Sequence, residues 1–325
     1  MGRDGYTLAR GGGAMMAWLS DNGLLLGLAV LDGLASAASI FMVAVGLNLV
    51  FGVLRILNVA HGSLYAIGAY TAASITLFLT SHGLPAWLSF PALVVAAALV
   101  GVILGPLIER VLLKRVEKQE PVLQLLVTFA LFMILEDVQK LIWGVQPVSN
   151  DTPMRLLGTI DVPFGADVIP FTAYQLFVLP GIALFTLVGL AWFMRRTLTG
   201  RVIVAVTTDR EAATSQGIDS AKITMLTFTF GAMLAALGGA LASPMSSMVP
   251  GVGASTIVLS FAVVATAGLG QVEGAAIAAV MIGLGRSIAV YLEPELEVVV
   301  PYLIMVLVLL VRPQGLFGVT ETRRI

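Results

Sequence analysis

Long apolar runs, separated by short charged or turn-forming stretches, dominate this chain. A bilayer core of about 30 Å is crossed by about 20 helical residues, and runs this apolar satisfy their backbone groups in lipid only as helices. The pattern therefore predicts an all-α polytopic transmembrane bundle of eight or nine membrane segments, the ninth arising where one apolar stretch divides into a hairpin. The predicted segments cover residues 33–54, 62–79, 86–108, 122–143, 174–194, 223–242, 255–269 with 274–292, and 298–311.

The first 31 residues have a weaker pattern. Asp21, Asn22 and Gly23 interrupt the apolar run at residues 14–31, so this part can be an interfacial helix or an extra span. We divide the chain into an N-terminal extension (residues 1–31), a transmembrane domain (32–318) that includes a polar loop at 195–222, and a tail (319–325). No cleavable signal peptide is evident, because the apolar run reaches no clear small-residue cleavage site.

Composition agrees with a membrane protein. Of the 325 residues, 58% are hydrophobic and 11% are charged, whereas soluble domains carry about 25% charged residues. The net charge of −1 argues against a nucleic-acid partner, and the absence of cysteine excludes disulfides and thiolate metal sites. His61 and His82 have no carboxylate cluster around them in the sequence, and no G-x-x-x-x-G-K-[ST] motif occurs. We therefore expect no catalytic residues, no metal site, no cofactor bound by this chain and no enzymatic activity.

The basic residues predict the orientation in the membrane. Twelve of the 18 lie in residues 110–118, 195–222 and 312–324. Alternating spans place these three segments on one side, and loops rich in Lys and Arg are cytoplasmic. We thus expect a cytoplasmic C-terminus and an external loop at residues 144–171.

A polar cluster interrupts the apolar pattern in the stretch FGVLRILNVAHGSLYAIGAYTAA, residues 51–73. Asn58 and His61 stand at i and i+3, so both can bond backbone groups freed where one helix ends and the next begins. Gly62 starts a row of small residues that lets helices approach closely. One interpretation is a hinge lining a translocation path, and the other is a polar corner between helices.

The loop at residues 195–222 contains a predicted short helix. Thr208 and Glu211 have the spacing of a capping box, Ala212 and Ala213 favour helix, and Gly217 is a natural stop. A helix of about eight residues is too short to be stable alone. It therefore docks on its own bundle or on another subunit, or it is an ordinary surface helix.

Charged residues within membrane segments are the remaining candidates. Glu136 and Lys140 stand at i and i+4, which favours a structural ion pair on one helix face. Arg286 lies inside the outer end of its predicted helix, with several glutamates beyond it. It can meet a substrate carboxylate in the translocation path, or extend toward those glutamates.

Three stretches, GLNLVFGVLRILNVAHGSLYAIGAY, DREAATSQGID and LLVRPQGLFG, together resemble the permease subunits of branched-chain amino acid ABC importers. The resemblance runs in order over residues 31–318. It implies the ABC importer permease fold, and it implies that the Glu-Ala-Ala-x-x-x-Gly pattern at Glu211, Ala212, Ala213 and Gly217 is the coupling helix, which sits in a groove of the ATPase.

The family resemblance also implies partners: separate ATPase subunits that bind ATP, a second permease subunit (identical or homologous), and a periplasmic solute-binding protein. It implies a multi-pass protein of the bacterial inner membrane that imports branched-chain or related small amino acids. Permeases for urea and short-chain amides resemble the same pattern, so this substrate class stays open. An ion-coupled secondary transporter normally has carboxylates in the middle of the membrane, and Glu136, Asp137 and Glu273 lie near span ends instead.

Overall fold

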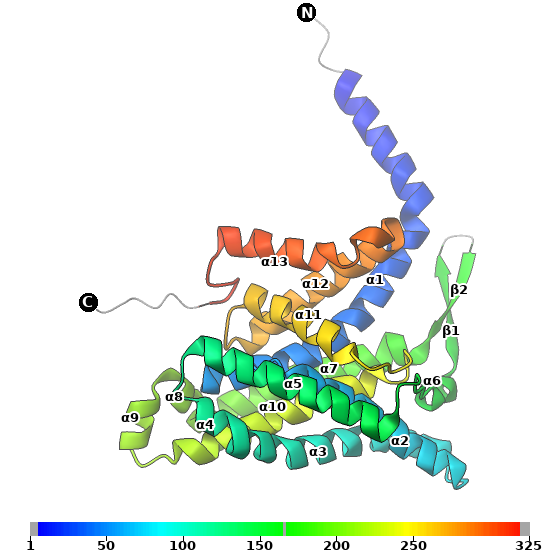
Figure 1. Ribbon diagram of the computed structural model, residues 1–325. Helices are drawn as coiled ribbons and strands as arrows, with labels where there is room; N and C mark the ends of the chain where they lie inside the picture. The colour runs from blue at the N-terminus through cyan, green and yellow to red at the C-terminus, as the bar shows by residue number, and fades with distance from the viewer. Residues whose placement is uncertain (1–5, 165–166, 319–325) are drawn as a thin grey trace, which may run out of the picture.

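The computed structural model describes residues 6–164 and 167–318 and has an all-α architecture with one small hairpin (Figure 1). The predicted tail at residues 319–325 lies outside this range. The long helices are α1 (Tyr6–Leu54), α2 (His61–Ser81), α3 (Ser89–Ile108), α5 (Pro121–Trp143), α7 (Leu179–Arg196), α10 (Ser220–Ala242), α11 (Val252–Ala267), α12 (Val272–Leu292) and α13 (Val299–Val311). Short helices are α4 (Lys114–Val116), α6 (Thr152–Leu157), α8 (Leu198–Thr208) and α9 (Arg210–Ser215). Every predicted membrane segment corresponds to one of the nine long helices.

Among the described residues, seven helical stretches are long and apolar enough to cross a membrane, and α11 and α13 are shorter apolar helices. Two stretches include a π-helical turn. Glu109–Leu113 joins α3 to α4, just after Pro106, which removes a backbone donor inside α3. Tyr174–Val178 precedes α7. The fold is therefore that of a polytopic helical bundle, as the apolar pattern predicts.

α1 differs most from expectation. It has 49 residues without a break, which at 1.5 Å per residue makes it about 74 Å long. Its N-terminal part extends beyond the other helices (Figure 1). Asp21, Asn22 and Gly23 do not interrupt the helix, since a single internal glycine costs only about 1 kcal/mol. No turn separates residues 14–31 from the first predicted span.

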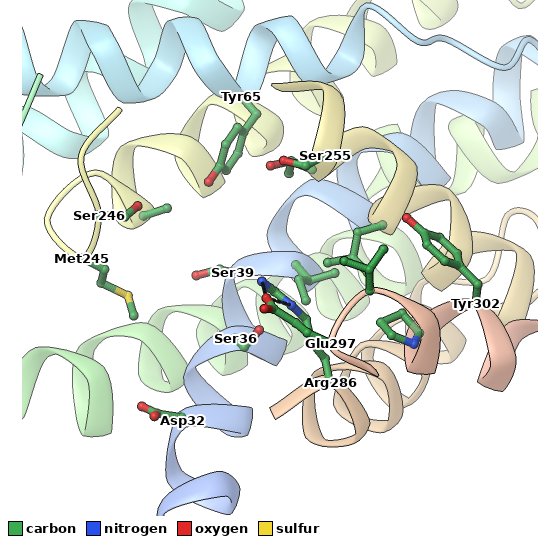
Figure 2. Close-up of a pocket in the computed structure, with 16 residues that line it drawn as sticks. Asp32, Ser36, Ser39, Tyr65, Met245, Ser246, Ser255, Arg286, Glu297 and Tyr302 are labelled. Carbon is green, nitrogen blue, oxygen red and sulfur yellow. Dashed lines mark hydrogen bonds and ion pairs between the residues drawn. The ribbon is translucent and has the colours of Figure 1, made fainter. Parts of the chain in front are cut away.

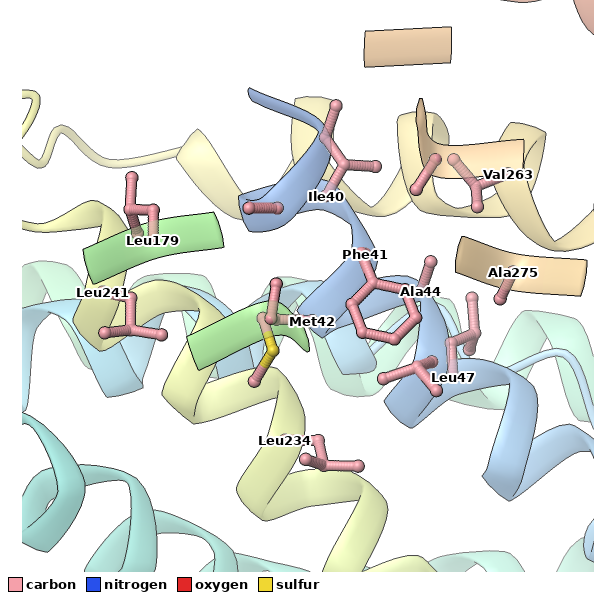
Figure 3. Packing of buried hydrophobic residues seen from close by; sticks show 14 of the residues in the cluster. Ile40, Phe41, Met42, Ala44, Leu47, Leu179, Leu234, Leu241, Val263 and Ala275 are labelled. Atoms are coloured by element: carbon pink, nitrogen blue, oxygen red, sulfur yellow. The ribbon is translucent and has the colours of Figure 1, made fainter. Parts of the chain in front are cut away.

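The core lies where α1 and α10 cross the centre of the bundle. α1 packs against α10 and α12, and α10 also packs against α2 and α3. Figure 3 shows the middle of α1, where Phe41, Met42 and Leu47 belong to the same buried cluster as Leu234 and Leu241 of α10. By contrast, few side chains of α5 and α7 are buried, as expected of surfaces that face lipid or another subunit.

Different elements lie at the two ends of the bundle. At one end, β1 (Thr159–Phe164) and β2 (Asp167–Thr172) form an antiparallel hairpin beside α6, within the loop that the sequence places outside. We call this the hairpin end. At the other end, α8 and α9 connect α7 to α10 (Figure 1), and we call this the α9 end.

Candidate functional site

The break between α1 and α2 lies against α5. α1 ends at Leu54, and Arg55 has a left-handed backbone conformation with φ of 55°. The Thr128 hydroxyl of α5 donates to the Leu57 carbonyl at 3.2 Å and accepts from the Val59 amide at 3.4 Å. Non-helical backbone at membrane depth needs such partners within the protein. Thr128 was missed in the sequence, because its contact partners are about 70 residues away.

Asn58 and His61 are both fully buried at this break. The Asn58 side-chain oxygen accepts from the Ala60 amide at 3.1 Å, so the predicted bond to freed backbone is confirmed for Asn58. For His61 it is wrong, since neither ring nitrogen has a hydrogen-bond partner among the described residues. His61 already lies in the first turn of α2 and its ring packs beside Gly46 of α1, where a Cβ would lie 3.1 Å from Nε2.

Gly62 lies at a tight crossing between α2 and α11. A Cβ built at Gly62 would lie 2.3 Å from the carbonyl oxygen of Gly253 and 2.8 Å from the Cβ of Ile257, both on α11. A Cβ at Gly253 would lie 2.5 Å from the carbonyl oxygen of Gly62. The two helices therefore cross backbone to backbone at this pair, which confirms the predicted tight packing of Gly62.

A cavity of about 420 Å³ lies toward the hairpin end, between α1, α2, α11, α12 and the start of α13. We call it the hydroxyl cavity, because side-chain hydroxyls outnumber other polar groups on its walls. Figure 2 shows the side chains of Arg286 and Glu297 together, with Tyr65 and Ser255 on another wall. It is lined by Asp32, Ser36, Ser39, Ile40, Tyr65, Ala242, Met245, Ser246, Ser255, Thr256, Leu259, Arg286, Glu297, Val298, Pro301 and Tyr302.

Three polar residues of this lining come from one face of α1. Asp32, Ser36 and Ser39 stand at i, i+4 and i+7, the spacing of one helical stripe. This stripe is visible in the sequence and was missed, because the predicted first span began at residue 33 and left Asp32 outside it. The Tyr291 hydroxyl of α12 donates to the Asp32 carboxylate, so this carboxylate is held by a neighbouring helix.

Arg286 forms an ion pair with Glu297, and both residues line the cavity. The sequence left two interpretations of Arg286 open, and the structure shows the one in which its side chain reaches a glutamate. Both side chains are little more than one-third exposed, at 38% and 36%. The predicted structural pair on α5 is also present, with Lys140 Nζ 3.0 Å from Glu136 and 3.1 Å from Asp137.

The predicted short helix is α9, and its cap differs from the prediction. Thr208 is the last residue of α8, where its hydroxyl donates to the Val204 carbonyl at 2.9 Å. The N-cap is instead Asp209, whose carboxylate accepts from the Ala212 amide at 2.9 Å. The capping box at Thr208 and Glu211 is thus wrong: the chain is extended at Asp209, and the helix starts one residue later than that box requires.

The C-terminal stop at Gly217 is confirmed. Gly217 has a φ of 83°, and its amide donates to the Thr214 carbonyl at 2.9 Å. The next amide, that of Ile218, donates to the Ala213 carbonyl at 3.2 Å. These two bonds form a Schellman motif, which satisfies carbonyls left free at a helix end.

One side of α9 faces the bundle and the other is free. Ala213 is buried in a cluster with Val53, Ile203 and Val206, while Arg210 pairs with Glu117 after α4. Glu211 and Ala212 are exposed. After α9, the backbone N–H of Lys222 donates to the Asp219 carboxylate at 3.2 Å, and this bond holds the pKa of Asp219 below its usual range.

Comparisons with known proteins agree on one family. The family described as branched-chain amino acid transport system, permease component, matches residues 29–309. The permease protein LivH of the high-affinity branched-chain amino acid transport system of Escherichia coli K12 is 26% identical over 297 residues, covering 90% of this chain and 96% of LivH.

Two further relatives extend this pattern. BraD of Pseudomonas aeruginosa, a permease protein of a high-affinity branched-chain amino acid transport system, is 27% identical, covering 91% of this chain and 97% of BraD. A probable branched-chain amino acid transport permease protein LivH of Methanocaldococcus jannaschii is 28% identical, covering 86% and 88%. With the helical bundle described above, these matches identify the chain as a multi-pass membrane protein that belongs to the permease family of branched-chain amino acid transport systems.

Proposed function

We propose that this chain is the permease subunit of an ATP-driven importer that moves branched-chain or related small amino acids into the cytoplasm. The observation that carries this proposal is the family match over residues 29–309, together with relatives that are named as branched-chain amino acid permeases and align over nearly their whole length. The nine long helices supply a membrane-spanning body, and the hydroxyl cavity supplies a polar compartment inside it.

In this proposal, ATP is bound and hydrolysed by separate ATPase subunits. The sequence of this chain holds no phosphate-binding loop motif. α9 provides the docking element: a six-residue helix with a cap at one end, a Schellman motif at the other and a free face that includes Glu211 and Ala212. A second permease subunit and a periplasmic solute-binding protein complete the complex.

The proposal also includes an orientation in a bacterial inner membrane. Segments rich in Lys and Arg flank the α9 end, which supports a cytoplasmic position for that end and for the C-terminus. The hairpin end then faces the periplasm, where a binding protein delivers substrate.

Uptake by the reconstituted complex tests the proposal. Proteoliposomes containing both permeases and the ATPase subunits, with ATP inside and the binding protein outside, are given labelled leucine, urea and acetamide. We expect ATP-dependent uptake of leucine. Uptake of urea or acetamide without leucine would overturn the amino-acid assignment in favour of an amide permease. Leucine uptake driven by an ion gradient without ATP would overturn the ATP-driven mechanism.

A further inference from the structure

The hydroxyl cavity combines one cation, two carboxylates and an apolar wall. Among the described residues, Arg286 is the only cationic side chain that lines it. Glu297 lies against Arg286, whereas the Asp32 carboxylate accepts from the Tyr291 hydroxyl. Ile40, Leu259 and Val298 line the same space. At about 420 Å³ it falls within the range of small-molecule sites, roughly 300–1,000 Å³. These are the groups that complement a carboxylate, an ammonium and an aliphatic side chain.

The ion pair leaves part of each charged group free. Arg286 Nε donates to Glu297 Oε1 at 3.1 Å, and its terminal nitrogen Nη2 donates to the same oxygen. Among the described residues, no hydrogen bond is made by Arg286 Nη1 or Glu297 Oε2. A guanidinium can bind a carboxylate through two parallel bonds, which makes it a specific anion site. Here Nη1 is unused within the part of the chain that the structure describes, and both residues of the pair line the cavity.

We propose that this cavity is a transient binding site for a free zwitterionic amino acid, whose carboxylate bonds Arg286 and whose ammonium bonds Glu297. The aliphatic side chain then lies against Ile40 and Leu259. This inference rests on the proposed function and adds the residues that receive the substrate. The sequence also allows Arg286 to meet a substrate carboxylate. The proposal combines that role with the ion pair between Arg286 and Glu297.

The ion pair argues for a charged substrate. A solvated pair of this kind contributes little to stability, so fastening the helices together does not account for it. Hydroxyls such as those of Ser39 and Tyr65 would bind a neutral amide equally well, and the two charges of the ion pair would add nothing to its binding. A zwitterion meets both charges at once. Since the pair is more than one-third exposed, the site stays hydrated and holds its substrate weakly, as a transport path requires.

The test compares variants and ligands in the assembled complex. Arg286→Gln removes the cation, and we expect leucine uptake to fall roughly tenfold to hundredfold, the equivalent of one charge-assisted hydrogen bond. Ligand contact is measured by saturation-transfer NMR on the complex in nanodiscs without binding protein, using leucine, leucinamide and 4-methylvalerate. Arg286→Gln should reduce the leucine and 4-methylvalerate signals, both of which report a carboxylate, and leave the leucinamide signal unchanged.

A charge swap separates binding from structure. If the pair only fastens α12 to the chain before α13, Arg286→Glu combined with Glu297→Arg restores the pair and restores uptake, which would overturn the proposal. We expect uptake to remain low in the swap, because the two charges then face the wrong ends of the substrate. Lys140→Gln is the matched control: it breaks an ion pair on α5 outside the cavity, and uptake should stay normal.

The outcomes also distinguish this proposal from the proposed function. Normal leucine uptake in Arg286→Gln, with uptake intact in the unmodified complex, overturns the cavity assignment alone. Absence of leucine uptake in the unmodified complex overturns both. If Arg286→Gln fails to assemble with the ATPase subunits, Arg286→Lys decides. Lysine keeps the charge without the two-pronged geometry, so leucine uptake should fall while assembly is retained, and full uptake would contradict the proposal.

Discussion

The crossing of α2 and α11 at Gly62 offers the sharpest test of the packing. In Gly62→Ala, the added Cβ would lie 2.3 Å from the carbonyl oxygen of Gly253, whereas ordinary contacts begin at 3.4 Å. The helices must therefore separate by about 1 Å, and overpacking of this kind costs about 1–3 kcal/mol. Gly62→Leu adds three more carbons at the same point, and we expect it to prevent folding or assembly.

Gly189 of α7 provides the matched control, because a Cβ there would meet nothing within 4 Å beyond its chain neighbours and its own helix backbone. Gly189→Ala should be neutral or stabilise the protein by up to about 1 kcal/mol, the gain in helix propensity. The free energy of unfolding is measured by SDS titration of the purified chain in mixed micelles, followed by circular dichroism. We expect the two alanine variants to differ by about 1–4 kcal/mol.

The reasoning fails if Gly62→Ala is as stable as Gly189→Ala. It also fails if Gly253→Ala is harmless, since a Cβ at Gly253 would lie 2.5 Å from the carbonyl oxygen of Gly62. Because both substitutions push the same two helices apart, their costs in the double variant should be smaller than the sum of the single costs, as for contacting residues.

Two further predictions concern the α9 end and the orientation. Glu211→Lys reverses an exposed charge on α9 and should reduce co-purification with the ATPase subunits while membrane insertion stays normal; undiminished co-purification and uptake would contradict the docking role. Cysteine introduced at Ser149 should react with an impermeant maleimide in intact cells, and cysteine at Thr199 should react only after lysis. The opposite pattern would invert the orientation. The chain has no cysteine of its own, so each label reports a single position.

Much of the fold could be predicted from the sequence, because span length and hydropathy are local properties. All nine predicted segments are helices, and the Gly217 stop and the Glu136–Lys140 pair follow from spacing along one element. The continuous α1 was missed, since polar residues were given more weight as helix breakers than they have inside a long helix. The β1–β2 hairpin was missed as well, within a loop assigned by its lack of hydrophobicity alone.

The site was less predictable, because its residues meet only in three dimensions. Asp32, Arg286 and Glu297 lie on separate segments, and the choice of Glu297 over the other nearby glutamates depends on the turn before α13. Thr128 shows the same limit: nothing at residues 55–60 indicates that a hydroxyl on α5 will form hydrogen bonds with the backbone between α1 and α2. Asp209 was missed as a cap for a local reason, since Thr208 offered an equally acceptable cap one residue earlier.

The break at residues 55–60 lies between the two ends of the molecule. Arg55 shares a cavity of about 510 Å³ with Asp209 and Arg210 at the α9 end, and Gly62 packs on α11, whose first turns line the hydroxyl cavity. Contiguity alone does not demonstrate coupling, and Asn58→Ala tests it. The variant loses the bond to the Ala60 amide at 3.1 Å, which leaves a buried donor unpaired at a cost of about 1–3 kcal/mol. If the break transmits motion, Asn58→Ala should assemble with the ATPase subunits and keep its leucine NMR signal, yet lose most uptake. Normal uptake would make the break a passive corner between helices.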